Sequence, residues 1–259
     1  STSDRTSKLF TKAVYDGQTK LIFTHDYFQD FGGWVEETKP FAIVEDGYVD
    51  KVVVSNKTTL GYYKEISASK YEAFLPDGVN EVLSDSPIVY RKGQNSIYFM
   101  TTGLTTMDTQ LMCYNFVTRE VHTVTGNTEG RYEVNFSPDG EYAEVNYHGP
   151  QNPWQKLIRM SDFDDYMNEN DDATPEEFFM TIEPINAPEK LSKKLALSNV
   201  PTRFYKQIEI DSYVLNVIEI VPPNFQPRGK KYPLLVYVYG GPGSQSAEKK
   251  APLGFQDVA

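Results

Sequence analysis

The chain has 259 residues with 36 acids and 25 bases, a formal charge of −11, and a hydrophobic content of 39%. This apolar content is enough for a core and excludes a wholly disordered chain. The acidic balance disfavours a nucleic-acid surface, which needs clustered Lys and Arg. The single Cys excludes an internal disulfide framework. At about 150 residues per domain, the length fits one large domain or parts of two.

The first part of the chain, up to about residue 160, alternates short apolar stretches with turn residues. Val, Ile, Thr, Tyr and Phe dominate these stretches, and a period of two recurs, which predicts antiparallel strands. No amphipathic helix is predicted here. The clearest predicted strands cover residues 41–47, 50–54, 96–100, 111–116 and 120–125.

A repeat within this part points to its architecture. Phe41–Gly47 is similar to Val134–Gly140, because each is a short apolar stretch that ends in Asp-Gly and precedes another predicted strand. The two Asp-Gly turns are 93 positions apart (140 − 47), and half of that is close to the ~40–50 residue period of propeller blades. The repeat therefore predicts a β-propeller, and a large β-sandwich is the alternative.

The pattern changes after residue 160. Eight of the sixteen residues from Asp162 to Glu177 are acidic, and we expect a solvated surface insertion there. A cation site is the alternative, but the Asp-x-Asp-x-Asp-Gly loop pattern is missing. Pro188–Leu197 has Pro and Glu in its first turn and Leu at helical spacing, so it predicts the one clear helix.

Three further strands are predicted near the end of the chain, over residues 203–210, 212–221 and 232–239. The last is almost entirely apolar, as expected for a strand buried on both faces of an α/β sheet. We therefore predict a boundary near residues 180–187, with propeller blades in residues 1–185 and the start of an α/β domain in residues 186–259.

The motifs of metal and nucleotide sites are absent from the sequence. His25, His122 and His148 have no partner at ligand spacing, and we predict no metal site. Gly240–Ser244 follows an apolar strand, but Pro242 removes an amide that a phosphate loop would use. We predict no cofactor.

A serine hydrolase of the α/β type needs Gly-x-Ser-x-Gly, then an acid, then a His. This sequence contains no such elbow and no His after His148, so we expect the 259 residues alone to be inactive. Tyr239 ends the last predicted strand and precedes the glycines, where its phenol could donate to an oxyanion. By residue pattern alone, a core or rim position is the favoured interpretation of Tyr239.

Lys230-Lys-Tyr-Pro-Leu-Leu-Val-Tyr-Val-Tyr-Gly-Gly-Pro-Gly-Ser-Gln245 resembles the segment that opens the catalytic domain in the prolyl oligopeptidase superfamily, most closely the dipeptidyl peptidase IV branch. The resemblance covers essentially the whole chain. Further matching segments lie at the entry of the catalytic domain and in the blades, namely Val217–Phe225, Gly33–Val35, Phe136–Gly140 and His148–Pro150.

The resemblance implies a mostly β chain: part of an eight-bladed propeller followed by the first strands of an α/β-hydrolase domain. It implies a serine exopeptidase that releases N-terminal Xaa-Pro or Xaa-Ala dipeptides, with its Ser/Asp/His triad outside this chain. Tyr239 matches the family's oxyanion-stabilising tyrosine. Lys39 is the nearest match to a basic residue that reaches the substrate from the propeller, although Glu36-Glu37-Thr38 departs from the family's pattern.

Partners and compartment follow from the same resemblance. We expect the protein to bind peptide substrates and not nucleic acid. We expect this chain to contact the rest of the same polypeptide or a complementary chain, and a homodimer is compatible with the family. Asn56 and Asn135 begin glycosylation sequons, which favours a secreted or membrane-anchored protein over a cytosolic one. No apolar run in this sequence approaches the ~20 residues of a membrane span, and its first residues do not resemble a signal peptide.

Two other function classes remain open at this point. An inactive family member could act as a binding or channel-accessory module, and only a Gly-x-Ser-x-Gly elsewhere in the protein would distinguish it from a peptidase. A free-standing propeller scaffold is disfavoured by the apolar strand and glycine loop near the end of the chain.

Overall fold

The structure, a computed structural model, divides into two compact units. One unit comprises residues 1–100 and 113–122, and the other comprises residues 101–112 and 123–259. The structure describes residues 10–15, 21–30, 33–39, 42–44, 47–54, 57–64, 72–74, 79, 81–83, 86–103, 105–149, 153–169, 172–186, 193–194, 197–198, 200–238 and 246–250.

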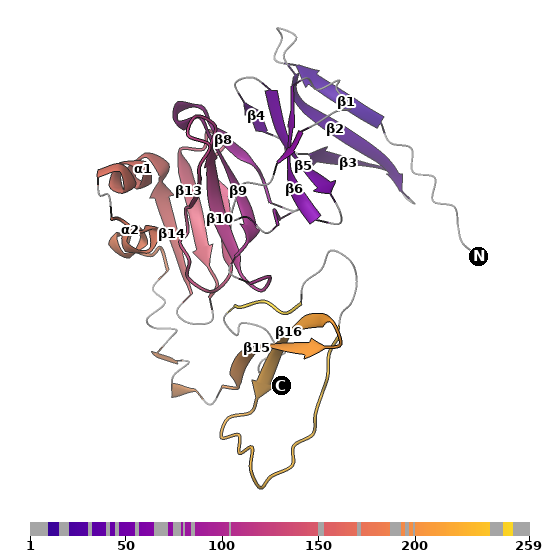
Figure 1. Cartoon of the computed structure of the whole chain (residues 1–259), viewed down its shortest axis with the longest axis vertical. Coiled ribbons are helices and arrows are strands. Elements are labelled where there is room, and N and C mark those ends of the chain that lie inside the picture. The colour runs from indigo at the N-terminus through magenta and orange to yellow at the C-terminus, as the bar shows by residue number, and fades with distance from the viewer. Residues whose placement is uncertain are drawn as a thin grey trace, which may run out of the picture. The chain divides into compact units, whose positions relative to one another are not determined.

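Antiparallel sheets dominate the described residues, and in each sheet the strands are neighbours in sequence order (Figure 1). Two sheets have four strands and two have three. The strands of these sheets are β1 (Phe10–Tyr15), β2 (Leu21–Asp30), β3 (Gly33–Lys39); β4 (Ala42–Val44), β5 (Gly47–Val54), β6 (Lys57–Tyr63), β7 (Glu72–Phe74); β8 (Val89–Arg91), β9 (Ser96–Thr102), β10 (Thr109–Asn115), β11 (Val121–Thr123); and β12 (Tyr132–Phe136), β13 (Tyr142–Tyr147), β14 (Trp154–Arg159).

This sequential order confirms the predicted strands and fits blades rather than a sandwich, whose Greek-key connections would break the order. The two predicted Asp-Gly turns both connect paired strands, β4 with β5 and β12 with β13. In the second, the amide of Gly140 donates to the carbonyl oxygen of Ser137 over 2.9 Å. Gly140 has a φ of 72°, which a residue with a side chain adopts at a cost.

The sheet of β12, β13 and β14 shows why its sequence alternates. One side chain in two is buried along each strand. The buried face includes an aromatic row across the three strands, in which the rings of Tyr132 and Tyr147 lie 4.9 Å apart and those of Tyr147 and Trp154 lie 5.5 Å apart. Cross-strand aromatic pairs of this kind stabilise a sheet beyond the area they bury.

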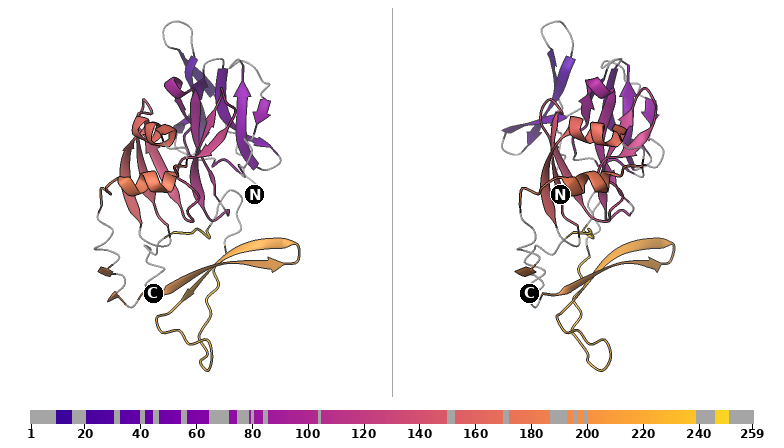
Figure 2. Two further views of the ribbon diagram at one scale, coloured as in Figure 1. Left: turned by 60° about the vertical axis from the view of Figure 1, so that its left-hand side comes forward. Right: turned by 90° about the vertical axis from the view of Figure 1, so that its left-hand side faces the viewer.

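The acidic stretch from Asp162 to Glu177 is largely helical, which corrects the predicted solvated insertion. Helices α1 (Met160–Glu169) and α2 (Pro175–Thr181) contact each other, and α1 contacts β14 (Figures 1 and 2). Most of the described acids in this stretch are exposed, while Phe163 and Phe178 are buried with rings 5.2 Å apart. Sparse aromatic residues thus supply the apolar face that the acidic composition obscures.

Local signals also fix where α2 begins. The hydroxyl of Thr174 accepts from the amide of Glu177, whose carboxylate accepts from the amide of Thr174, and Pro175 starts the helix. This is a capping box with Pro in the first turn. The carboxylate of Glu176 accepts from the amide of Asn127 over 2.6 Å, which ties the start of α2 to the β11–β12 connection.

The last described elements are β15 (Thr202–Ile210) and β16 (Tyr213–Val221), a two-stranded antiparallel hairpin that matches its prediction. The predicted strand from Tyr232 is not formed over residues 232–238, and Leu234–Val238 are exposed. A strand buried on both faces needs partners on both edges, and the described residues pair none with it. Of the predicted helix at 188–197, only residues 193, 194 and 197 are described, and these are helical.

Candidate functional site

The most connected polar group in the described part of the second unit is the carboxylate of Asp108, at the end of the loop before β10. Its Oδ2 accepts from the amide of Thr105 over 3.0 Å and from the hydroxyl of Thr105 over 2.6 Å. Its Oδ1 accepts from the amide of Gly130 over 2.8 Å. Asp108 is fully buried, and these donors replace the water that an ionised carboxylate would lose on burial.

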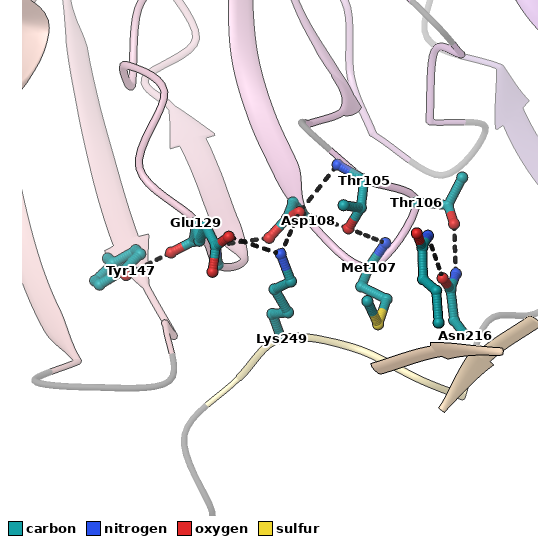
Figure 3. Close-up of polar contacts among 10 residues, drawn as sticks. Thr105, Thr106, Met107, Asp108, Glu129, Tyr147, Asn216 and Lys249 are labelled. Carbon is teal, nitrogen blue, oxygen red and sulfur yellow. Dashed lines mark hydrogen bonds and ion pairs between the residues drawn. The ribbon is translucent and has the colours of Figure 1, made fainter. Parts of the chain in front are cut away.

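Lys249 completes this cluster from a distant part of the chain (Figure 3). Its Nζ lies 3.1 Å from Oδ2 of Asp108 and 3.3 Å from Oε1 of Glu129. The backbone amide of Lys249 also donates to the carbonyl oxygen of Met107 over 3.0 Å. The Lys249 side chain is only 7% exposed, so its charge is neutralised by ion pairs and not by solvent. We call Thr105, Asp108, Glu129 and Lys249 the Asp108 anchor.

A second ion pair lies next to the anchor, and in this pair residues 246–250 supply the acid and not the base. Glu248, which precedes Lys249, pairs with the guanidinium of Arg131, which follows the loop that holds Glu129. Both side chains are largely buried. Glu248 and Lys249 therefore each pair with a residue of opposite charge. The two ion pairs together fix the register of residues 246–250 against the sheet.

The same segment is bound to the hairpin of β15 and β16. The carbonyl oxygen of Lys250 accepts from the hydroxyl of Tyr205 over 2.7 Å and from the guanidinium of Arg203 over 3.3 Å. The hairpin in turn reaches the loop of the anchor, since Nδ2 of Asn216 donates to the hydroxyl of Thr106 over 2.6 Å. Residues 105–108 thus contact both the hairpin and residues 246–250.

Tyr147 supports the loop that carries Glu129. Its hydroxyl donates to the carbonyl oxygen of Glu129 over 2.6 Å. Burial raises the pKa of Tyr147, and the carboxylates of Asp108 and Glu129 raise it further. The phenol therefore remains a protonated donor, as this hydrogen bond requires.

The role of this cluster is structural and not catalytic. The carboxylate of Asp108 is occupied by donors on both oxygens, and Lys249 is paired with two carboxylates. Neither group is poised as a nucleophile or a base. The arrangement instead holds the segment after the Gly240–Gly243 stretch at a defined place. Among the residues that the structure describes, no three His, Cys, Asp or Glu side chains are grouped to hold a metal ion.

Comparison with known proteins connects this geometry to a family. The family model of the dipeptidyl peptidase IV N-terminal region matches residues 2–154, more than half of the chain. The chain belongs to the dipeptidyl peptidase IV family. The "Probable dipeptidyl-aminopeptidase B" of Ajellomyces dermatitidis is 34% identical over 98% of the chain. The chain spans about a quarter of that relative, 27% of its length.

Solved structures support the fold of this dipeptidyl peptidase IV relative. A putative dipeptidyl aminopeptidase IV from Bacteroides ovatus has a TM-score of 0.57 at 16% identity, covering 92% of this chain and 35% of its own. Porphyromonas gingivalis dipeptidyl peptidase 4 has a TM-score of 0.52 at 10% identity, covering 96% of this chain and 44% of its own. Together with the open, sequence-ordered sheets, these similarities confirm a partial propeller.

The residues predicted from the family pattern are only partly within the described structure. Tyr239 and Asn56 lie outside the described residues. Lys39 is the last residue of β3, where its backbone pairs with Thr24, and its side chain is not described. Asn135 lies on β12 with an exposed side chain, whose amide is 3.4 Å from the carboxylate of Glu144. The described structure therefore brings none of these predicted residues together.

The sequence-based reasoning missed Asp108 and Lys249. A weak local signal existed in Thr105-Thr-Met-Asp108. Its hydroxyl and its carboxylate are three positions apart, a spacing at which the two side chains can form a hydrogen bond within one turn. Nothing local indicates Lys249, which is 141 positions from its partner. In this dipeptidyl peptidase IV relative, the anchor is visible only in three dimensions.

Proposed function

We propose that this chain is part of a serine peptidase that releases N-terminal dipeptides ending in Pro or Ala. The observation that carries the proposal is the extent of the family relationship. A relative named as a dipeptidyl aminopeptidase aligns with 98% of the chain, which extends past the glycine-rich segment that follows Tyr239. In this proposal, residues 1–185 are blades of the propeller and residues 186–259 begin the peptidase domain, and the extent of the relationship supports both assignments.

In this proposal the chain contributes substrate access and one catalytic donor. The phenol of Tyr239 donates a hydrogen bond to the oxyanion that forms when the scissile carbonyl is attacked. Lys39 contacts the peptide substrate from the propeller. The nucleophilic Ser, with its Asp and His, comes from outside these 259 residues, because they contain no Gly-x-Ser-x-Gly and no His after His148.

The test compares the full-length protein with the 259-residue chain on a chromogenic Xaa-Pro substrate. We expect turnover by the full-length protein and none by the chain alone. A fluorophosphonate probe, which labels activated serines, should mark only the full-length protein. A folded full-length protein with neither turnover nor labelling would overturn the peptidase proposal and support an inactive accessory module. Turnover by the chain alone would overturn the assignment of the triad.

We also propose that the full-length protein follows the secretory route and can form a homodimer. The exposed side chain of Asn135 supports the first part, since a glycan needs solvent. Within the described part of the chain, no helix is long and apolar enough to cross a bilayer. A glycosidase-sensitive mass that Asn56→Gln and Asn135→Gln abolish would support secretion, and light scattering would report the oligomeric state.

A further inference from the structure

The hairpin of β15 and β16 needs support from other segments of the chain. Most of its side chains are exposed, and Val221, at the end of β16, is the one residue of the two strands that is buried. An isolated two-stranded hairpin is at best marginally stable in water, because two strands bury little apolar surface. The contacts that attach this hairpin to its neighbours are therefore important for keeping it formed.

Two side chains of β15 bind one backbone atom of Lys250. The hydroxyl of Tyr205 donates to the carbonyl oxygen of Lys250 over 2.7 Å, and the guanidinium of Arg203 donates to the same oxygen over 3.3 Å. The backbone before this oxygen forms a tight turn, because the amide of Lys250 donates to the carbonyl oxygen of Glu248 over 3.0 Å. The attachment of β15 therefore depends on the position of a single carbonyl group.

Lys249 fixes the position of that carbonyl group. Its backbone amide donates to the carbonyl oxygen of Met107, and its buried ammonium group pairs with Asp108 and Glu129. A buried carboxylate with donors on both oxygens, such as Asp108, is a rigid attachment point. Among the residues that the structure describes, the ammonium group of Lys249 has its polar contacts with these two acids and none with the hairpin.

The hairpin meets the same loop through its other strand. Nδ2 of Asn216, on β16, donates to the hydroxyl of Thr106 over 2.6 Å. Figure 3 shows Asn216 and Lys249 meeting the loop of residues 105–108 from two different segments. The loop, residues 248–250 and the hairpin therefore form a closed set of contacts, in which each segment touches the other two.

We infer that residues 248–250, which we call the clasp, retain the β15–β16 hairpin on the loop of residues 105–108. Lys249 acts on the hairpin indirectly, by holding the carbonyl group of Lys250 in place for Tyr205. Loss of the Lys249 ammonium should therefore loosen the hairpin, while the sheet of β12, β13 and β14 stays formed. No step of this coupling involves the proposed peptidase chemistry.

Three variants of the full-length protein separate the two roles of the clasp. Lys249→Gln removes the buried ammonium group. Lys250→Gln is the matched control, because it removes a neighbouring ammonium that is 51% exposed and pairs with Glu248, but keeps the carbonyl group that holds β15. Exposed ion pairs of this kind contribute little to stability. Tyr205→Phe breaks the link from the hairpin side and leaves Lys249 in place.

Hydrogen exchange of the backbone amides measures the effect in each segment separately. For Lys249→Gln we expect exchange about 10- to 100-fold faster in the hairpin and in the clasp, the effect of losing a charged hydrogen bond. For Tyr205→Phe we expect exchange about 2- to 10-fold faster in the hairpin alone, because a neutral hydrogen bond is lost. Lys250→Gln should match the wild type, and the amides of β12–β14 should be unchanged in all three variants.

The double variant of Lys249→Gln and Tyr205→Phe tests the coupling directly. If the clasp transmits the effect of Lys249, the hairpin should exchange as fast in the double variant as in Lys249→Gln alone. Effects that simply multiply would overturn the inference. Unchanged hairpin exchange in Lys249→Gln, an equal effect of Lys250→Gln, or faster exchange throughout β12–β14 would also overturn it. If Lys249→Gln does not fold, unchanged hairpin exchange in Tyr205→Phe would have the same meaning.

Discussion

Lys156 donates a hydrogen bond from its ammonium group to the carbonyl oxygen of Phe179, in the last turn of α2. The same ammonium lies 4.7 Å from the centroid of the Trp154 ring. Burial lowers the pKa of Lys156, and the carboxylate of Glu183 opposes this shift. A cation at the C-terminal end of a helix is favourable, so a mostly buried lysine attaches α2 to β14.

Replacement of Lys156 should loosen α2. We expect Lys156→Ala to lower the free energy of local opening of α2 by about 2 kcal/mol, through loss of the charged donor and of the packed stem. Lys156→Met keeps the stem and should cost about 1 kcal/mol. Native-state hydrogen exchange of the α2 amides measures both values. An equal cost for the two variants would contradict a role for the stem.

The aromatic contacts of α1 and α2 should be a main source of their stability. Phe178 is 3% exposed and lies near the rings of Phe163, Tyr166 and Phe179. We expect Phe178→Ala to cost about 3–5 kcal/mol, because it leaves a cavity. Met180→Ala on the same helix, at an 82% exposed position, should change stability by less than about 0.5 kcal/mol. Thermal unfolding of the two variants provides the comparison.

Stability should fall at alkaline pH because of two buried phenols. Burial is the largest cause that raises the pKa of Tyr132 and of Tyr147 above the ordinary value of 10.0. A phenol with a raised folded-state pKa contributes stability that is complete below pH 10.0 and is lost as the pH rises through the folded-state value. The urea midpoint should therefore decrease above about pH 10.

Tyr132→Phe should reduce this alkaline loss, since Phe has no proton to lose in either state. Lys156 acts in the opposite direction, because its lowered pKa penalises the folded state until the pH approaches 10.5. The comparison must therefore be between Tyr132→Phe and wild type at each pH. Identical pH dependence of the two proteins would contradict the assigned burial of the phenol.

Tyr239→Phe in the full-length protein tests the proposed catalytic donor. Loss of the hydroxyl should lower kcat by about 10²–10³-fold, as at other oxyanion donors, with little change in KM or melting temperature. Tyr237→Phe, two positions earlier, is the matched control and should leave kcat unchanged. A lowered melting temperature with normal kcat would instead assign Tyr239 to the core.

Period-two patterns predicted most of the fold because each strand pairs with its neighbour in sequence. β12 and β13 are an example, since an Asp-Gly turn with Gly140 at positive φ joins two alternating stretches. Helices α1 and α2 escaped prediction because few apolar residues, Phe163 and Phe178 among them, lie among many acids. Residues 232–238 were misread because an apolar run specifies a strand only where partners exist.

The candidate site was less predictable than the fold for a related reason. Tyr239 and Lys39 could be named because they lie in short motifs of a known family. Asp108 and Lys249 could not, since no local pattern links an acid to a lysine 141 positions away. Residue types alone also give each of them an ordinary surface role, whereas the structure buries both.

The separation between Asp108 and Lys249 has a consequence for the order of folding. Each sheet closes through contacts between adjacent strands, which cost little loop entropy, whereas the anchor closes a loop of 141 residues. During synthesis, Asp108 and the strands around it leave the ribosome long before Lys249. We therefore expect the sheet to be formed first and residues 246–250 to dock onto it late, so that this later part of the chain is assembled on a template that has already folded.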